Sequence, residues 1–124
     1  MNVIDSSGWL AYFAEEPTAE EFYSPLQDTE SLIVPVITIY EVFKVVLRES
    51  NENFALQAIA AMQKGNVLEL TTSLAIAAAR YSIEYQLPMA DSVILATARK
   101  YDAIIWTQDI DFKDIPGAKY FSKK

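Results

Sequence analysis

Short apolar segments alternate with longer segments of helical periodicity along the whole chain, and this alternation constrains the fold most. We expect strands at 3–4, 32–34, 103–107 and 119–121, with 67–70 either a strand or an extended link. We expect helices at 8–14 (capped by Ser6 or Ser7), 18–24, 37–49, 53–63, up to 85 from a cap at Thr72 or Ser73, and 90–101. Strands separated by helices are joined by crossover connections and pair in parallel. The pattern therefore predicts an α/β fold with a parallel sheet.

The distribution of charge limits the classes of partner. The chain has 124 residues and a net charge of −7, with ten acids and two bases in residues 1–62 and seven acids and eight bases in 63–124. We find no repeat or linker, so residues 1–124 are expected to form a single domain. A typical nucleic-acid-binding domain is basic. A phosphate-containing substrate would therefore need a local positive centre, and a bound divalent cation is one candidate.

The sequence contains no cysteine and no histidine. This excludes disulfides, thiolate zinc sites, cysteine nucleophiles and histidine-based triads. A general base would have to be a carboxylate, a lysine, a tyrosine or metal-bound water. No apolar run reaches the roughly 18–20 residues that span a bilayer, and no basic segment followed by an apolar stretch begins the chain. We expect a soluble cytoplasmic protein that does not bind membranes.

Acidic residues follow two of the predicted strands. Asp5 ends the first strand, and Asp109 lies just beyond the strand 103–107, which has no polar residue before Thr107 and is expected to be buried on both faces. Ligands of open parallel sheets bind beyond the carboxyl ends of the strands, where the strand order reverses. If these two strands are neighbours, both carboxylates point into the same crevice.

Glu41 and Asp91 are the other two acids in an unusual context. Glu41 is the lone acid of the apolar stretch "VPVITIYEVFKVVL", and Asp91 precedes the apolar helix "SVILATA". Each has a plain structural alternative. Glu41 can pair with Lys44 on its own helix, and Asp91 can cap the helix or interact with its dipole. Asp5 can be a helix cap, and Asp109 can be a turn acid.

A convergence of these acids has a chemical consequence. Two like charges 4 Å apart repel by roughly 4 kcal/mol at an effective dielectric constant near 20. Either some of the carboxyl groups stay protonated, or a cation neutralises them. Oxygen ligands without histidine or cysteine favour Mg²⁺ or Mn²⁺ over zinc. One or two such ions can activate water and stabilise the charge that develops on a phosphodiester.

Four stretches together resemble the PIN-domain nucleases, and most closely the VapC-type toxins of type II toxin–antitoxin pairs. They are "NVIDSSGWLAYF", "PVITIYEVF", "LPMADSVILATARKYDAIIWTQDIDF" and "IPGAKYF", and they span almost the whole chain in the family's order. The resemblance implies a three-layer α/β/α sandwich around a small parallel sheet of four or five strands. It also implies a metal-dependent endoribonuclease that hydrolyses RNA with Mg²⁺-activated water.

The resemblance also implies roles for individual residues. Asp5, Glu41, Asp91 and Asp109 match the family's four acidic residues, the catalytic groups and ligands of Mg²⁺ or Mn²⁺. Thr107 matches a hydroxyl that orients ligands, and Ser6 matches a position that hydrogen-bonds a ligand carboxylate or water. Asp111 either assists the metal site or caps the turn before Phe112, and we favour the turn.

The family further implies a homodimer and a cognate antitoxin, which often places an arginine at the acidic site. Two aromatic groups are either core or a partner groove: residues 9–23, and a helical stripe containing Tyr40, Phe43 and Leu47. Two other functions compete. One is a catalytically silent PIN-like module that binds a metal or a partner. The other is a phosphoacceptor receiver domain, which would need an acid pair near the first strand and a suitably placed lysine that the chain lacks.

Overall fold

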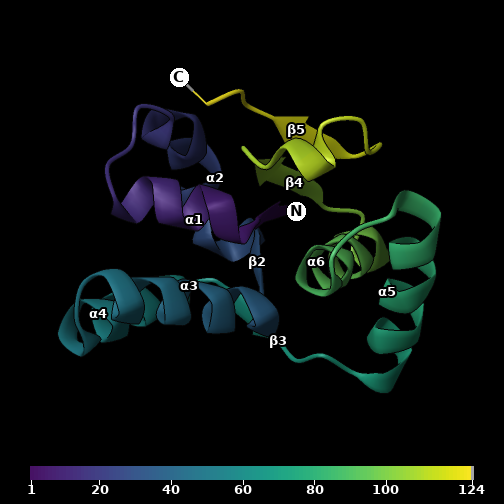
Figure 1. Cartoon of the computed structure of the whole chain (residues 1–124), viewed down its shortest axis with the longest axis horizontal. Coiled ribbons are helices and arrows are strands. Elements are labelled where there is room, and N and C mark those ends of the chain that lie inside the picture. The colour runs from purple at the N-terminus through teal and green to yellow at the C-terminus, as the bar shows by residue number, and fades with distance from the viewer. Residues whose placement is uncertain (124) are drawn as a thin grey trace.

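A computed structural model describes residues 1–123 and shows five parallel strands with helices on both faces of the sheet (Figure 1). The strands are β1 (Asn2–Ile4), β2 (Leu32–Pro35), β3 (Asn66–Leu68), β4 (Ile104–Thr107) and β5 (Ala118–Tyr120). The helices are α1 (Ser6–Phe13), α2 (Tyr23–Gln27), α3 (Val36–Glu49), α4 (Glu52–Met62), α5 (Thr72–Tyr85) and α6 (Met89–Lys100). Three short 3-10 helices are η1 (Ala19–Phe22), η2 (Thr29–Ser31) and η3 (Ile110–Phe112). The predicted α/β sandwich is confirmed.

Alternate residues of the inner strands pack on opposite faces of the sheet. Val3, Ile33 and Ile105 belong to one core cluster with residues of α6. Their neighbours Ile4 and Val34 belong to a second cluster, with residues of α1, α3 and α4. Side chains alternate along a strand, so each inner strand buries both faces. The helices α5 and α6 therefore cover one face, and α1 to α4 cover the other (Figure 1).

The strand order is β3-β2-β1-β4-β5. The chain builds β2 and β3 on one side of β1 and then crosses to add β4 and β5 on the other. The strand order thus reverses between β1 and β4, which pair in parallel with Ile4 opposite Trp106. This is the position at which open α/β sheets bind ligands. The strands that precede Asp5 and Asp109 are therefore neighbours in the sheet, as the sequence analysis required.

Two predicted helix caps were wrong. Asp5, rather than Ser6 or Ser7, is the N-cap of α1, and its side chain accepts a hydrogen bond from the Gly8 amide. Thr71, rather than Thr72 or Ser73, caps α5 by accepting from the Leu74 amide. All of these residue types are good caps, so the residue with extended backbone just before the first turn takes the role.

The strand 103–107 is not buried throughout, because Ile104 is 47% exposed and Ala103 precedes β4. Ile104 lies at the amino end of the strand, where its amide donates to the carbonyl of the exposed Met1.

Within residues 1–123, no helix combines the length and the apolarity needed to cross a lipid bilayer.

Candidate active site

Asp5 is the innermost acid of the candidate site. It follows β1 directly, its amide donates to the Trp106 carbonyl of β4, and its side chain is 1% exposed. Its position as N-cap of α1 fixes the carboxylate at the start of that helix. Gly8 allows this close packing, because a Cβ there would lie 2.6 Å from the Ile4 side chain. The end of β1 and the first turn of α1 together fix the buried position of Asp5.

Three groups donate hydrogen bonds to the Asp5 carboxylate. The Ser7 hydroxyl donates at 2.8 Å to Oδ1 and lies 3.0 Å from Oδ2, the Thr107 hydroxyl donates at 2.7 Å, and the Gly8 amide at 3.0 Å. Burial nevertheless raises the pKa of Asp5 to about 6, against the lowering effect of these donors and with a smaller contribution from the charge of Asp109. The donors favour the charged form and burial opposes it.

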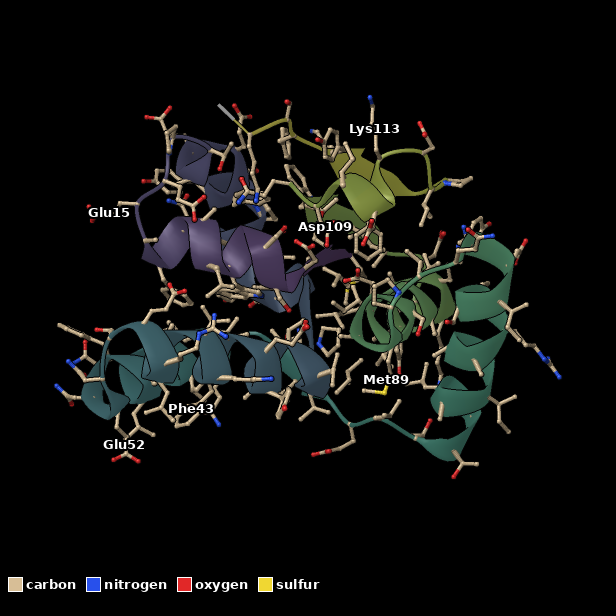
Figure 2. The ribbon with its side chains drawn as sticks, in the orientation of Figure 1. Glu15, Phe43, Glu52, Met89, Asp109 and Lys113 are labelled. Atoms are coloured by element: carbon tan, nitrogen blue, oxygen red, sulfur yellow. The ribbon has the colours of Figure 1, made fainter. Side chains whose placement is uncertain are left out.

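Thr107 connects Asp5 to the next acid. Its hydroxyl donates to Asp5 and accepts from the Asp109 amide at 2.9 Å. Asp109 then caps η3, because its Oδ1 accepts from the Asp111 amide at 2.9 Å. Figure 2 shows Asp109 between α1 and α6. The position predicted for Thr107 as an orienting hydroxyl matches these contacts.

Asp91 has the most perturbed carboxyl group of the site. It lies in the first turn of α6, but Pro88 is the N-cap position, and the Asp91 side chain accepts no hydrogen bond from residues 1–123. Its pKa is raised to about 8, mainly by burial and then by the charges of the neighbouring acids, which are, in order of effect, Asp109, Asp5, Glu41 and Asp111. All four of these acids therefore act on one carboxyl group. The alternative role of Asp91 as a helix cap finds no hydrogen bond to support it.

Glu41 reaches the site from α3. The Ser6 hydroxyl of α1 donates a hydrogen bond to Glu41 Oε1. Lys44 forms no salt bridge with Glu41, so the structural alternative of an ion pair along α3 is wrong. Ser6 therefore holds a carboxylate in place, which is the kind of contact predicted for it.

The donors suit a hard divalent cation. Asp91, Asp109 and Asp111 each offer a carboxylate oxygen, and these oxygens lie within 4.8 Å of one another. None of the five acids forms a salt bridge with a residue in the described part of the chain. An all-oxygen set of this kind fits Mg²⁺ or Mn²⁺. The role that we favoured for Asp111, capping the turn before Phe112, is wrong, because Asp109 is the cap. The Asp111 carboxylate instead lies beside those of Asp91 and Asp109.

Ser7 and Gln108 are site residues that the sequence did not single out. Ser7 donates to Asp5 and accepts from the Gln108 amide at 3.1 Å. The Gln108 side chain is buried, accepts from the Thr18 hydroxyl, and donates to the Ser7 carbonyl at 3.4 Å and to Glu16 at 3.3 Å. The dipeptide Ser6-Ser7 after an aspartate was the available signal, but only tertiary contacts distinguish the two serines.

Comparison with known proteins identifies the family and the fold. The profile of the PIN domain matches residues 3–118. No curated protein sequence matches the chain.

Among solved structures, a toxin–antitoxin complex from Klebsiella pneumoniae superposes with a TM-score of 0.82 at 21% identity, covering 98% of this chain and 99% of that one. VapC20 from Mycobacterium tuberculosis, described as a sarcin–ricin-loop-cleaving toxin, gives 0.80 at 17% identity, covering 94% and 96%. DNA-bound VapBC from Salmonella typhimurium gives 0.75 at 18% identity, covering 98% of each chain.

Proposed function

The chain belongs to the PIN domain family, and from this membership we propose that it is the endoribonuclease toxin of a toxin–antitoxin pair. The observation that carries the proposal is the group of carboxylates of Asp91, Asp109 and Asp111, whose oxygens lie within 4.8 Å of one another. The charges of Asp5 and Glu41 also act on Asp91 and support it. The toxins and toxin–antitoxin complexes among the structural neighbours support the assignment of the chain as a toxin.

Asp91, Asp109 and Asp111 would hold a Mg²⁺ or Mn²⁺ ion, with Asp5 and Glu41 adding negative charge around it. When bound, a divalent cation there activates water and neutralises charge on a phosphodiester. The chain's own residues position the acids. Ser7, Thr107 and the Gly8 amide orient Asp5, and Ser6 orients Glu41. Such contacts hold the catalytic groups in the orientation that the reaction needs, which lowers the entropic cost of reaching the transition state.

The proposed partners follow from the same family membership. They are an RNA substrate, a cognate antitoxin and a second copy of the chain, with residues 1–124 acting as one nuclease domain. The neighbours that are toxin–antitoxin complexes support the antitoxin. Co-expression and co-purification of this chain with the product of any small reading frame found next to its gene would test that partner.

Cleavage of end-labelled RNA in the presence of Mg²⁺, Mn²⁺ or excess EDTA tests the activity. We expect cleavage with either metal, no cleavage in EDTA, and products with a 5′-phosphate and a 3′-hydroxyl. Undiminished cleavage in EDTA would contradict the metal dependence. Metal binding without cleavage of any RNA would favour the alternative of a silent binding module.

A further inference from the structure

Basic side chains are scarce on the half of the chain that contains Asp5 and Glu41. Residues 1–62 contain two bases, Lys44 and Arg48. Both lie on α3, the helix that also carries Glu41. An RNA strand that approaches the acid cluster over residues 1–62 would therefore find positively charged side chains on α3 alone.

The spacing of these residues places them on one face of α3. Lys44 and Arg48 follow Glu41 by three and seven residues, which keeps all three within a sector of about 60°. The two bases lie about 4.5 Å and 10.5 Å beyond Glu41 along the helix axis. Ser6 hydrogen-bonds Glu41, whose charge acts on Asp91 of the acid cluster. The positive charges thus form a row that begins about one helical turn from the site.

Both bases are available to bind a ligand. Lys44 forms no salt bridge with the described residues, and its Nζ lies 5.7 Å from the centre of the Tyr40 ring. Arg48 contacts Glu49 at 3.3 Å, with the side chains 61% and 67% exposed. An exposed ion pair of this kind contributes little stability. A phosphate group can therefore replace either contact at small cost.

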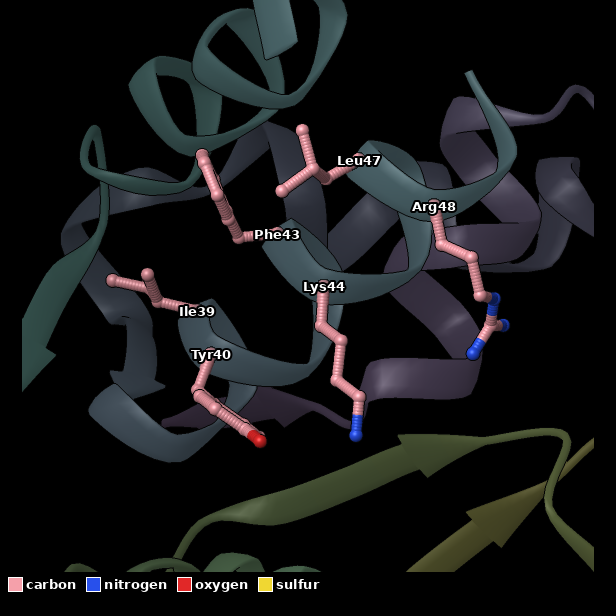
Figure 3. A pocket seen from close by; sticks show the side chains of 6 residues that line it. All are labelled: Ile39, Tyr40, Phe43, Lys44, Leu47 and Arg48. Atoms are coloured by element: carbon pink, nitrogen blue, oxygen red, sulfur yellow. The ribbon is translucent and has the colours of Figure 1, made fainter. Parts of the chain in front are cut away.

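A hollow of about 570 Å³ adjoins the row (Figure 3). It is lined by Ile39, Tyr40, Phe43, Lys44, Leu47 and Arg48. Figure 3 shows the side chains of Tyr40, Lys44 and Arg48 extending to the same side of α3. Tyr40 is 60% exposed, so its ring is open to stacking by an unpaired base. An aromatic ring beside a row of basic side chains is the arrangement that binds single-stranded nucleic acids.

Two bases of the C-terminal half already have partners within the fold. The Arg99 guanidinium lies 4.9 Å and 5.1 Å from the ring centres of Tyr81 and Tyr85 and donates to the Pro116 carbonyl. Lys119 lies 4.3 Å from the ring centre of Trp106. Arg99 lies on the same helix as Asp91, but at the opposite end, about 12 Å away along the axis of α6. Lys119 lies in β5.

We propose that a single-stranded segment of RNA extends from the acid cluster along α3, with successive phosphates at Lys44 and Arg48 and a base stacked on Tyr40. This deepens the proposed function, on which it rests, by naming the strandedness of the substrate and the path that it follows. It also explains how an acidic protein holds a polyanion.

The test is the binding of a fluorescein-labelled oligouridylate to the Asp91→Asn protein in EDTA, measured by anisotropy over a range of salt concentrations. In that background, Lys44→Gln and Arg48→Gln should each weaken binding about fivefold and reduce the salt slope by about 0.7. The exposed bases Lys64 and Arg80 provide matched controls, whose Gln variants should bind as tightly as the parent. Tyr40→Leu should weaken binding, whereas Tyr101→Leu should not.

Three results would overturn the proposal. The first is an equal loss of RNA affinity in the Lys64 and Arg80 variants, and the second is equal affinity of the protein for an RNA duplex of the same length. The third is a substitution on this face that changes the mass of the protein assembly and leaves RNA affinity unchanged. For the last, sedimentation velocity of Tyr40→Leu and Leu47→Ala would reveal whether this face contacts a second copy. The binding assay involves no cleavage, so its outcome is independent of whether the wild-type protein hydrolyses RNA.

Discussion

Asp5 and Asp91 are close enough for the charge of one to act on the other, and they are stabilised differently. Asp5 is 1% exposed but accepts hydrogen bonds from three donors, and its pKa is about 6. Asp91 is less deeply buried but accepts none, and its pKa is about 8. The more buried acid thus ionises more readily. Hydrogen-bond donors and neighbouring charges, together with burial, determine which carboxyl group of the site is charged.

The largest expected effect is on the rate of RNA cleavage, and it is the same for both acids. We expect Asp5→Ala and Asp91→Asn each to reduce RNA cleavage by more than about a hundredfold, since loss of a residue that merely supports a metal ligand already costs 10- to 100-fold. Initial rates with end-labelled RNA and saturating Mn²⁺ measure this. Asn at position 91 keeps the shape of the side chain, so circular dichroism should be unchanged. Full activity of either variant would remove that acid from the site.

The two acids should differ in their effect on folding. At pH 5 both are mostly protonated in the folded protein. We expect Asp5→Ala to lower the free energy of unfolding by about 1–2 kcal/mol, because it removes the cap of α1 and leaves donors unpaired. We expect Asp91→Ala to raise it by up to about 1 kcal/mol, because no hydrogen bond is lost and a cost of burial disappears.

Urea denaturation in EDTA at pH 5 compares the two variants. Glu84→Ala is a control, because Glu84 is an exposed acid on α5 away from the cluster. Destabilisation of similar size by both aspartate variants would mean that Asp91 has a structural role in the folded chain, and the contrast between the two acids would fail.

The sequence could predict that Asp5 and Asp109 lie near each other, because their positions follow from the order of the strands. Asp5 and Asp109 come after β1 and β4, and parallel strands end at the same edge of the sheet. Ser7 and Gln108 were missed because their roles depend on contacts between residues about 100 positions apart. Periodicity also could not show that Tyr40 and Leu47 stay 60% and 44% exposed, because an exposed and a buried helical stripe have the same spacing.

Ser7 provides a sharper test of how Asp5 is held. We expect Ser7→Ala to weaken Mn²⁺ binding about tenfold, at the lower end of the effect of residues that support a metal site, because it loosens a charge that Asp5 places beside the ion. The hydroxyl lies within 3.0 Å of both Asp5 oxygens, and its loss frees the carboxylate to rotate. Calorimetric titration with Mn²⁺ measures the affinity. Ser7→Thr retains the hydroxyl and should restore most of it. An unchanged affinity for Ser7→Ala would leave Thr107 and Gly8 sufficient to orient Asp5.

The smallest expected effect is the pH dependence of stability without metal. Both pKa values are raised above 3.8 in the folded state, so the folded protein binds more protons than the unfolded chain, and stability falls as pH rises from about 4 towards 8. The decline due to Asp5 ends near pH 6, and the decline due to Asp91 continues to about pH 8. Asp91→Ala should therefore remove about 1 kcal/mol of the fall between pH 6 and pH 8, after allowance for solvent screening.

Urea denaturation in EDTA at half-unit steps of pH measures this difference. Because a cation and protons compete for the same oxygens, stabilisation by Mn²⁺ should increase over the same interval. If wild type and Asp91→Ala gave parallel curves above pH 6, Asp91 would already be ionised there, and its neighbours would not act on it as the structure indicates.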